Sequence, residues 1–415
     1  MQENTYDTVV IGGGAAGLAG ASKAAELGLN TIILENTDHL GGIPYQCTHP
    51  GFGNFYYQEN LTGSEFSERL KTHAMNKEIT SITNAHVSKI EVQSDYTKKI
   101  TVITPEGINH IITKTILYTT GARERHVYET GIQGDRVSGI YTAGETQTLM
   151  DVYGVMPGKH VLIIGSGDIG LIMARRFALE GATVVGVIEM LPCPGGLSRN
   201  VVQCLHDFQI PLYLNRMVKE IRGTKRVEQV ITVSVDDQFQ PIANTEKIFE
   251  CDTVALATGL IPYTKLLDDL GVTIDPATKG PMVNDHFETN IPGIFAAGNV
   301  LAINDYVDDA AVQGEQAAYG AHKYTQQSEG THASLKRVEK KGNIRMVIPQ
   351  YISGNHDVTL YLRVKKPQPN ITIKIPEIDK EITKAGATPS QMITVSLSQQ
   401  ELSKMNNQLT IEVSK

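Results

Sequence analysis

Several features that would point to particular functions are scarce or absent in this chain of 415 residues. Its four cysteines, at positions 47, 193, 204 and 251, form no C-x-x-C pair, which excludes a disulfide scaffold and a metal or dithiol centre of that spacing. The 37 Lys and Arg are outnumbered by 45 Asp and Glu, so the positive surface typical of nucleic-acid binding is missing. No apolar run reaches the ~20 residues of a bilayer-spanning helix, because glycines and Asp168 interrupt the longest runs.

What is present indicates a folded protein of more than one domain. Hydrophobic residues make up 41%, enough for packed cores, and the length predicts two or three domains at roughly 100 to 200 residues each. Residues 1–4 (MQEN) lack the positive segment that opens a secretory signal. We therefore expect a reduced, cytoplasmic protein with no membrane span.

One unit occurs twice, at residues 8–35 (TVVIGGGAAGLAGASKAAELGLNTIILE) and 161–189 (VLIIGSGDIGLIMARRFALEGATVVGVIE). Each copy runs from a β-branched stretch through G-x-G-x-x-G into a helical stretch closed by glycine, then into a second β-branched stretch ending in Glu. One such match is weak evidence, but two in full context predict two dinucleotide-binding domains. The alternative is a glycine-rich crossover that binds nothing.

The spacing has a physical reason. The first glycine permits a tight turn after a buried strand, the second lets a pyrophosphate approach the backbone, and the third lets helix and strand pack closely. The helix N-terminus then faces the phosphates, and the Glu accepts hydrogen bonds from a ribose. The first site comprises Gly12, Gly14, Ala15, Ala16, Gly17 and Glu35, and the second comprises Gly165, Gly167, Asp168, Ile169, Gly170 and Glu189.

Four more glycine-containing segments accompany the repeat: residues 40–53 (LGGIPYQCTHPGFG), 116–123 (ILYTTGAR), 254–262 (VALATGLIP) and 291–300 (IPGIFAAGNV). With the repeat, they resemble the pyridine nucleotide-disulfide oxidoreductase group of flavoproteins over residues 1–330. Residues 41–53, 142–159, 165–176 and 194–212 are similar to one branch of that group. The branch holds the FAD- and NAD-binding subunits of dye-linked proline dehydrogenase, opine oxidase and hydrogen cyanide synthase, with dehydrogenases that accompany glycerol-3-phosphate dehydrogenase.

The resemblance implies FAD at the first unit and a nicotinamide nucleotide at the second. It adds Gly41, Gly42, Val87, Thr120, Gly121, Gly298 and Asn299 to the FAD site and Gly259 to the NAD site. Asn299 replaces the Asp of the common Gly-Asp pair, and its amide can still hydrogen-bond a ribityl chain. A helix over residues 308–324 would stabilise the negative charge of reduced FAD with its N-terminus; the alternative is a plain amphipathic surface helix.

The choice of nicotinamide nucleotide depends on Glu189. A carboxylate there repels a 2′-phosphate and suits a free 2′-hydroxyl, so NAD(H) is favoured over NADP. Arg199 lies ten residues further on, and a positive charge near the ribose would favour NADP instead.

Cys47 is the candidate for further chemistry. A thiol beside the flavin, activated by His49, would serve a second half-reaction, whereas the alternative is a packed cysteine that shapes its loop. The family's C-x4-C pair is missing, which disfavours dithiol reduction. The other three cysteines are expected to be structural, and the pairs Asp268–Asp269 and Asp308–Asp309 to be solvated or helix-capping.

The resulting hypothesis is an FAD-dependent NADH oxidoreductase, with hydride passing between NADH and FAD and electrons going on to an unidentified acceptor. The alternative is an electron-transfer or scaffold subunit of a hetero-oligomeric dehydrogenase with little activity alone. A third variant is an oxidase that acts through Cys47. A partner subunit and a homo-oligomer stay open, and neither nucleic acid nor a metal is expected.

The predicted fold class is α/β, with two Rossmann-like domains and a small C-terminal β-rich domain. Residues 1–120 and 284–330 would bind FAD, residues 121–283 would bind NAD(P), and residues 331–415 would form the third module. That last segment carries 13 Lys and Arg against 7 Asp and Glu. Its alternating runs, such as residues 358–364 (VTLYLRV), predict short strands.

Overall fold

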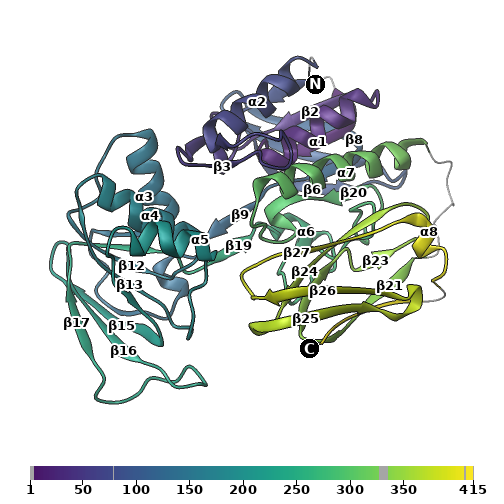
Figure 1. Cartoon of the computed structure of the whole chain (residues 1–415). Coiled ribbons are helices and arrows are strands. Elements are labelled where there is room, and N and C mark those ends of the chain that lie inside the picture. Colours follow the sequence, from purple (N-terminus) through teal and green to yellow (C-terminus); the bar gives the residue numbers. More distant parts are fainter. Residues whose placement is uncertain (1–3, 78, 327–334, 406–407, 415) are drawn as a thin grey trace. The chain divides into compact units, whose positions relative to one another are not determined.

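The computed structural model describes residues 4–77, 79–326, 335–405 and 408–414 (Figure 1). The chain divides into two compact units, Met1–Ala122 with Pro262–Lys415 (unit 1) and Arg123–Ile261 (unit 2). Each unit contains a parallel sheet, and the end of the chain is rich in strands, which confirms the predicted α/β class. Among the described helices, none is both long and apolar enough to cross a membrane.

Unit 1 is built on a sheet in the order β5-β2-β1-β8-β7-β6, with β20 beside β8. The strands β5, β2, β1, β8 and β20 are parallel, whereas β6 and β7 extend the sheet with antiparallel pairs from β8. The strands are β1 (Asn4–Ile11), β2 (Thr31–Leu34), β5 (Thr80–Ile82), β6 (His86–Val92), β7 (Lys98–Thr104), β8 (Gly107–Tyr118) and β20 (Ile294–Ala296), and the helices are α1 (Ala15–Glu26), α2 (Gly63–Met75) and α7 (Val307–Gln326).

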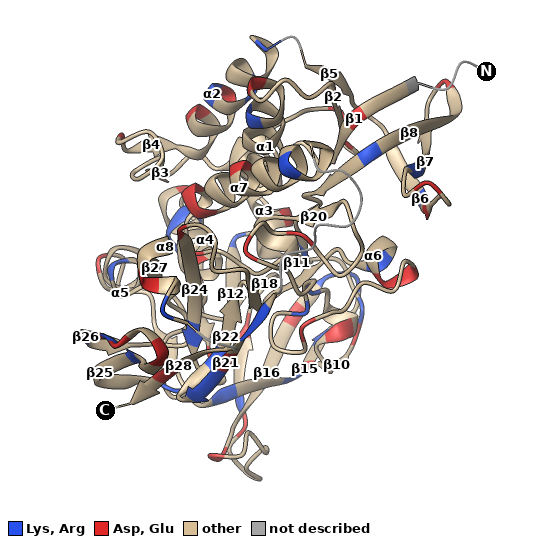
Figure 2. Cartoon of the chain, turned by 90° about the vertical axis from the view of Figure 1, so that its right-hand side faces the viewer, with Lys and Arg blue, Asp and Glu red and all other residues tan. Residues whose placement is uncertain are grey.

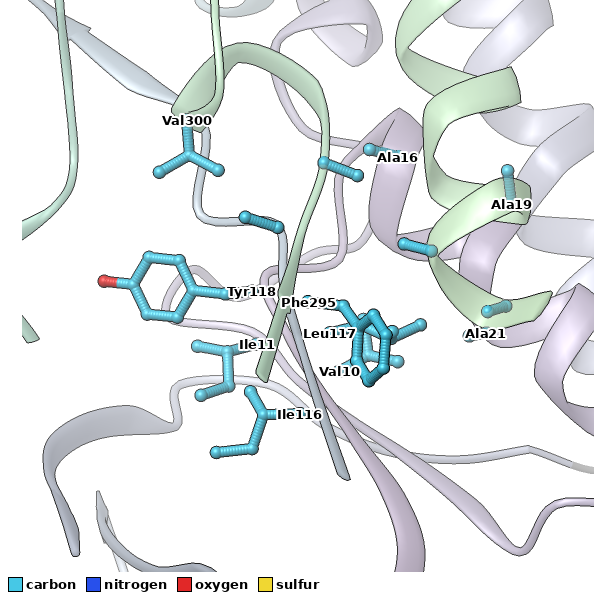
Figure 3. Packing of buried hydrophobic residues seen from close by; sticks show 14 of the residues in the cluster. Val10, Ile11, Ala16, Ala19, Ala21, Ile116, Leu117, Tyr118, Phe295 and Val300 are labelled. Atoms are coloured by element: carbon cyan, nitrogen blue, oxygen red, sulfur yellow. The ribbon is translucent and has the colours of Figure 1, made fainter. Parts of the chain in front are cut away.

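Small residues bring α1 against α7 in unit 1. A Cβ added to Gly20 would lie 2.9 Å from the carbonyl oxygen of Gly314, and one added to Gly314 would lie 2.0 Å from that of Ala16. Only glycine therefore allows the two backbones this approach. Beneath them lies a buried core, part of which Figure 3 shows with Leu117 of β8 beside Phe295 of β20.

Unit 2 repeats the parallel architecture. Its five-stranded sheet has the order β11-β18-β12-β13-β14, and a second sheet has the order β10-β15-β16-β17. The elements are β10 (Gln133–Gly134), β11 (Ile140–Thr142), α3 (Ala143–Gln147), β12 (His160–Ile164), α4 (Asp168–Leu179), β13 (Thr183–Ile188), α5 (Ser198–Val201), β14 (Leu212–Tyr213), β15 (Arg216–Gly223), β16 (Val227–Ser234), β17 (Lys247–Glu250) and β18 (Thr253–Leu256). Both G-x-G-x-x-G sequences thus follow a buried parallel strand and open a helix.

The C-terminal module of unit 1 packs two antiparallel-rich sheets around a core of their own. Their orders are β23-β21-β28-β25-β26 and β22-β24-β27. The strands are β21 (Lys336–Gly342), β22 (Ile344–Ile348), β23 (Tyr351–Ile352), β24 (Val358–Val364), β25 (Gln368–Ile375), β26 (Lys380–Ala387), β27 (Ile393–Leu397) and β28 (Leu409–Ser414). In Figure 2 the ribbon of β21 is blue where it carries Lys and Arg residues.

The two units divide the chain differently from the three expected domains, because unit 1 includes residues 121–122, 262–283 and 331–415. Residues 262–283 lie in unit 1, whereas the sequence assigned them to the nucleotide domain that corresponds to unit 2. Leu267, Val272 and Val283 pack into the core of unit 1, which explains the difference. The C-terminal module is joined to the same region, because the side chain of Gln350 accepts from the Val283 amide and donates to Asp275, each at 2.9 Å.

Candidate dinucleotide-binding sites

The first glycine motif forms a tight turn between β1 and α1. Gly12 has a φ of +102°, and a Cβ added there would lie 2.5 Å from the carbonyl oxygen of Thr119. One added to Gly17 would lie 1.9 Å from the oxygen of Gly12. Gly14 differs, because its added Cβ meets only the Cα of Gly42, at 3.8 Å. Two glycines are thus required by packing, and the third borders open space.

That open space lies at the start of α1. Gly14 is the N-cap and offers no side-chain hydrogen bond, so the first amide groups of the helix lack the usual capping partner. An anion such as a pyrophosphate is the ligand that these groups bind. The loop at Gly41 and Gly42 borders the space, with the Gly41 amide donating to the Gly13 carbonyl at 2.8 Å.

Glu35 lies where the motif predicts it, directly after β2. One carboxylate oxygen accepts from the Gly13 amide at 2.7 Å, and the other accepts from the amide and hydroxyl of Thr37 at 2.8 and 2.9 Å. These bonds fix the carboxylate beside the glycine turn and leave lone pairs for a ribose. Sequence reasoning missed Thr37, which carries no motif signal of its own.

The second glycine motif repeats this geometry in unit 2. Gly165 has a φ of +102°, with an added Cβ 2.2 Å from the oxygen of Ala257. A Cβ on Gly170 would lie 2.3 Å from the oxygen of Gly165, whereas one on Gly167 meets nothing within 4 Å. Gly167 caps α4 with no side-chain hydrogen bond. The two motifs therefore form matching glycine cradles.

Glu189 is held by a similar set of bonds after β13. One of its oxygens accepts from the amide and hydroxyl of Ser166 at 2.9 and 2.5 Å, and the other from the Leu191 amide at 2.9 Å. The carboxylate is 8% exposed, so its charge acts at close range on any ribose substituent there.

Residues 195–200 fold back on the start of α4. The Gly195 amide donates to the Ser166 hydroxyl at 2.8 Å, and Asp168 accepts from the Leu197 amide and the Asn200 side chain at 2.8 and 2.7 Å. Asp168 therefore holds this loop. Ile169 follows it in the first turn of α4 and is partly buried.

A further segment, which the resemblance assigned to the first site, begins where β20 ends. Gly298 has a φ of +77°, its amide donates to the Gln313 side chain at 3.1 Å, and an added Cβ would lie 2.9 Å from that of Ala16. The amide oxygen of Asn299 accepts from the Asn304 amide at 3.0 Å. This turn therefore lies against the first turn of α1 in unit 1, beside the first cradle.

Asp308 contradicts the expectation of a solvated or capping side chain. It is 2% exposed and accepts hydrogen bonds from the backbone amides of Gly53, Phe55 and Tyr56 at 3.1, 2.9 and 2.9 Å. Three donors from a distant loop explain how a charge is tolerated there. Burial raises the pKa of the adjacent Asp309 to about 6, with Asp305 and Asp308 adding repulsion.

The remaining predicted positions are turns and strand edges. Gly121 and Gly259 have φ values of +69° and +97°. The Thr120 hydroxyl donates to the Tyr263 carbonyl at 3.2 Å, and the Arg125 amide donates to the Gly259 carbonyl at 3.1 Å. Val87 lies on β6 and is buried. Thr119, which donates to Ile11 and Gly12 beneath the first cradle, was not singled out.

Cys47 is buried where the loop of residues 43–46 meets α2. Its thiol lies 3.5 Å from the Ile43 carbonyl oxygen, and a Cβ added to Gly63 would lie 2.5 Å from the cysteine Cβ. Nearby, the ring of His49 packs against Phe52, with 5.2 Å between ring centroids. Cys204 and Cys251 are also buried, and burial raises the pKa of the Cys204 thiol to about 11.

Comparisons with known proteins agree with this geometry. Residues 6–324 match the model of the family described as pyridine nucleotide-disulphide oxidoreductase. Mitochondrial dihydrolipoyl dehydrogenase of Sus scrofa is 28% identical over 334 residues, covering 71% of this chain and 62% of that enzyme. The chain thus spans less than two thirds of that relative's length.

Solved structures extend the comparison. Thioredoxin reductase of T. acidophilum superposes with a TM-score of 0.66 at 27% identity, covering 78% of this chain and all of that chain. L-proline dehydrogenase of P. horikoshii gives 0.58 at 17% identity, covering 79% of this chain and 57% of that chain, which is a likeness of fold alone.

Proposed function

Because the chain belongs to the pyridine nucleotide-disulphide oxidoreductase family, we propose that it is an FAD-dependent oxidoreductase that takes hydride from NADH and passes electrons to an acceptor. One observation carries the proposal. Each parallel sheet delivers its chain into a glycine cradle that opens at an uncapped helix N-terminus and is bordered by a buried glutamate.

FAD fits the cradle of unit 1. The amides at the start of α1 would hold its pyrophosphate, Glu35 its ribose, and the turn at Gly298 and Asn299 its ribityl chain. The cofactor supplies hydride acceptance and electron delivery, which no side chain of this protein offers. Val87, Thr120 and Gly121 would complete the site through backbone groups.

NADH fits the cradle of unit 2. The α4 N-terminus would bind its pyrophosphate, and Glu189 would accept hydrogen bonds from the adenosine ribose. A 2′-phosphate at that position would meet the buried carboxylate, so we propose NADH rather than NADPH as reductant. Gly259 would lie beside the nucleotide as in the family.

The electron acceptor is proposed to take electrons from the flavin without a protein dithiol, since the sequence has no C-x-x-C or C-x4-C pair. This favours a small molecule or a partner subunit, as in the branch that includes dye-linked proline dehydrogenase. Four cysteines that are free thiols support a reducing compartment, the cytoplasm.

Anaerobic titration of the purified yellow protein tests the proposal. NADH should bleach the visible flavin absorbance at one equivalent, and NADPH should do so only at far higher concentration. A protein that takes up no FAD, or whose bound flavin neither nucleotide reduces, overturns it. An acceptor screen on the isolated chain, compared with chain purified with any co-eluting polypeptide, separates the enzyme from the electron-transfer subunit.

A further inference from the structure

A cluster of metal-ligating side chains lies in unit 1 outside both cradles. Asp285 and His286 precede β20, and His356 lies in the turn between β23 and β24. One ligand atom from each residue lies within 4.8 Å of those of the other two. The Asp285 side chain is completely buried, and the His356 side chain is 27% exposed.

Two electron-pair donors in this cluster lie close together without a hydrogen bond between them. His356 Nε2 lies 3.3 Å from the Asp285 carbonyl oxygen, and because a carbonyl only accepts, Nε2 carries the ring proton of the neutral tautomer. Nδ1 then holds a bare lone pair, 3.8 Å from Asp285 Oδ2. Among the described residues, His356 Nδ1 and Asp285 Oδ1 are both buried and have no hydrogen-bond partner. Such orphaned acceptors are costly unless a hydrogen-bond donor or a cation satisfies them.

We propose that Asp285, His286 and His356 bind a divalent transition-metal ion, and that this ion is Zn²⁺. Two imidazole nitrogens and one carboxylate oxygen are a zinc ligand set, with a fourth position for water. Ion–ligand distances of about 2.0 to 2.2 Å are compatible with the 3.8 Å separation after a small contraction. The ion would pin the C-terminal module to the segment before β20.

Bonds around the ligands support this assignment. Asp285 Oδ2 accepts from the amide and the hydroxyl of Ser353, both at 2.7 Å, and His356 is oriented by its bond to a carbonyl. Metal-binding carboxylates and imidazoles are held by second partners in this way.

Two features of this arrangement must change when an ion binds. The rings of His286 and His356 are stacked at 4.2 Å with 5° between their planes, so one ring must tilt before both nitrogens point at one ion. Lys323 Nζ lies 3.2 Å from His286 Nε2 and brings a positive charge to the site. Because Lys323 is exposed, it can move away at a cost in affinity.

Calorimetric titration of Zn²⁺ into the full-length, untagged protein, used as purified and after chelator treatment, tests the proposal. We expect one ion per chain, a loss of affinity of at least tenfold in Ser353→Ala, and a larger loss in His356→Ala and in Asp285→Asn. Lys323→Gln should bind more tightly than the wild type, because it removes the competing charge. His206→Ala, an exposed histidine of unit 2, is the matched control and should leave the affinity unchanged.

Circular dichroism and thermal unfolding show which variants are folded, and Lys323→Gln tests the site without removing a ligand. Absence of stoichiometric Zn²⁺ binding overturns the proposal, as does equal binding by wild type and His356→Ala. Equal affinity for Mg²⁺ would also refute it, because an N₂O ligand set prefers Zn²⁺. None of these outcomes depends on turnover of NADH, so the site and the proposed function fail independently.

Discussion

Substituting Gly167 by alanine separates nucleotide binding from folding. Its φ and ψ are −63° and 165°, a conformation that alanine adopts without strain, and an added Cβ meets nothing within 4 Å. Replacing glycine at a compatible position stabilises a protein by about 0.4 to 1 kcal/mol. Gly167 is the N-cap of α4, where alanine is less favourable than glycine. The two effects oppose each other, so we expect the stability of Gly167→Ala to lie within about 1 kcal/mol of the wild type.

Nucleotide binding, by contrast, should weaken. The new methyl group would occupy the space at the α4 N-terminus in which the pyrophosphate of NADH is proposed to lie. A hydrogen bond to a charged group contributes about 1.5 to 3 kcal/mol, and about 1.4 kcal/mol is a tenfold change in affinity. Loss of one such bond raises the dissociation constant of NADH about tenfold to a hundredfold.

The assay is anaerobic flavin reduction at varied NADH, with thermal unfolding measured on the same samples. Gly170→Ala is the matched variant in which folding is affected. Its added Cβ would lie 2.3 Å from the Gly165 carbonyl oxygen, so this substitution should destabilise unit 2. FAD content, which depends on unit 1, should be unchanged in Gly167→Ala. Unchanged NADH affinity in a normally folded Gly167→Ala protein would show that no pyrophosphate lies there.

Three further outcomes are expected. Glu189→Gln should narrow the preference for NADH over NADPH by at least tenfold in kcat/KM, because the amide removes the charge that opposes a 2′-phosphate; an unchanged ratio would place the discrimination elsewhere. Asp309→Asn should raise Tm at about pH 8 and have no effect below pH 3.8, since burial raises the pKa of this carboxyl from 3.8 to about 6 and the ionised form is disfavoured only in the folded state; Tm measured across that range checks the sign. Cys47→Ser should keep the rate of flavin reduction by NADH within about twofold, because the thiol lies against the Ile43 carbonyl; a tenfold loss in stopped-flow traces would show that the sulfur takes part.

The elements that the sequence predicted well are those in which local pattern and tertiary role coincide. The alternating run at residues 358–364 is β24 itself, and the β-branched runs before both glycine motifs are buried parallel strands. These runs are apolar because both faces or one face of each strand is covered. The boundary near residue 283 was missed because it depends on packing: Leu267 and Val272 bury themselves against strands that lie far away in the sequence.

The site residues likewise divide into those set by local sequence and those set by tertiary packing. The roles of Gly12 and Gly165 follow from spacing, because a turn with positive φ is a local requirement. The burial of Asp308 could not be predicted from the local sequence. Its carboxylate is buried by a loop some 250 residues earlier, and nothing in the local pattern distinguishes it from Asp268, which is exposed. The partners of Asp285 and His356 likewise come from separate parts of unit 1.

The loops that cover the two cradles are held in place by different contacts. This difference is relevant to how readily each nucleotide would exchange. At the first, the Gly41 amide bonds to the Gly13 carbonyl, and a Cβ on Gly42 would lie 2.8 Å from the Cα of Gly14, so backbone meets backbone with no side chain between. At the second, the cover over α4 is held through the side chains of Ser166 and Asp168. Side chains change rotamer at lower cost than backbone rearranges. A cofactor that stays bound suits the first closure, and a reductant that exchanges at every turnover suits the second.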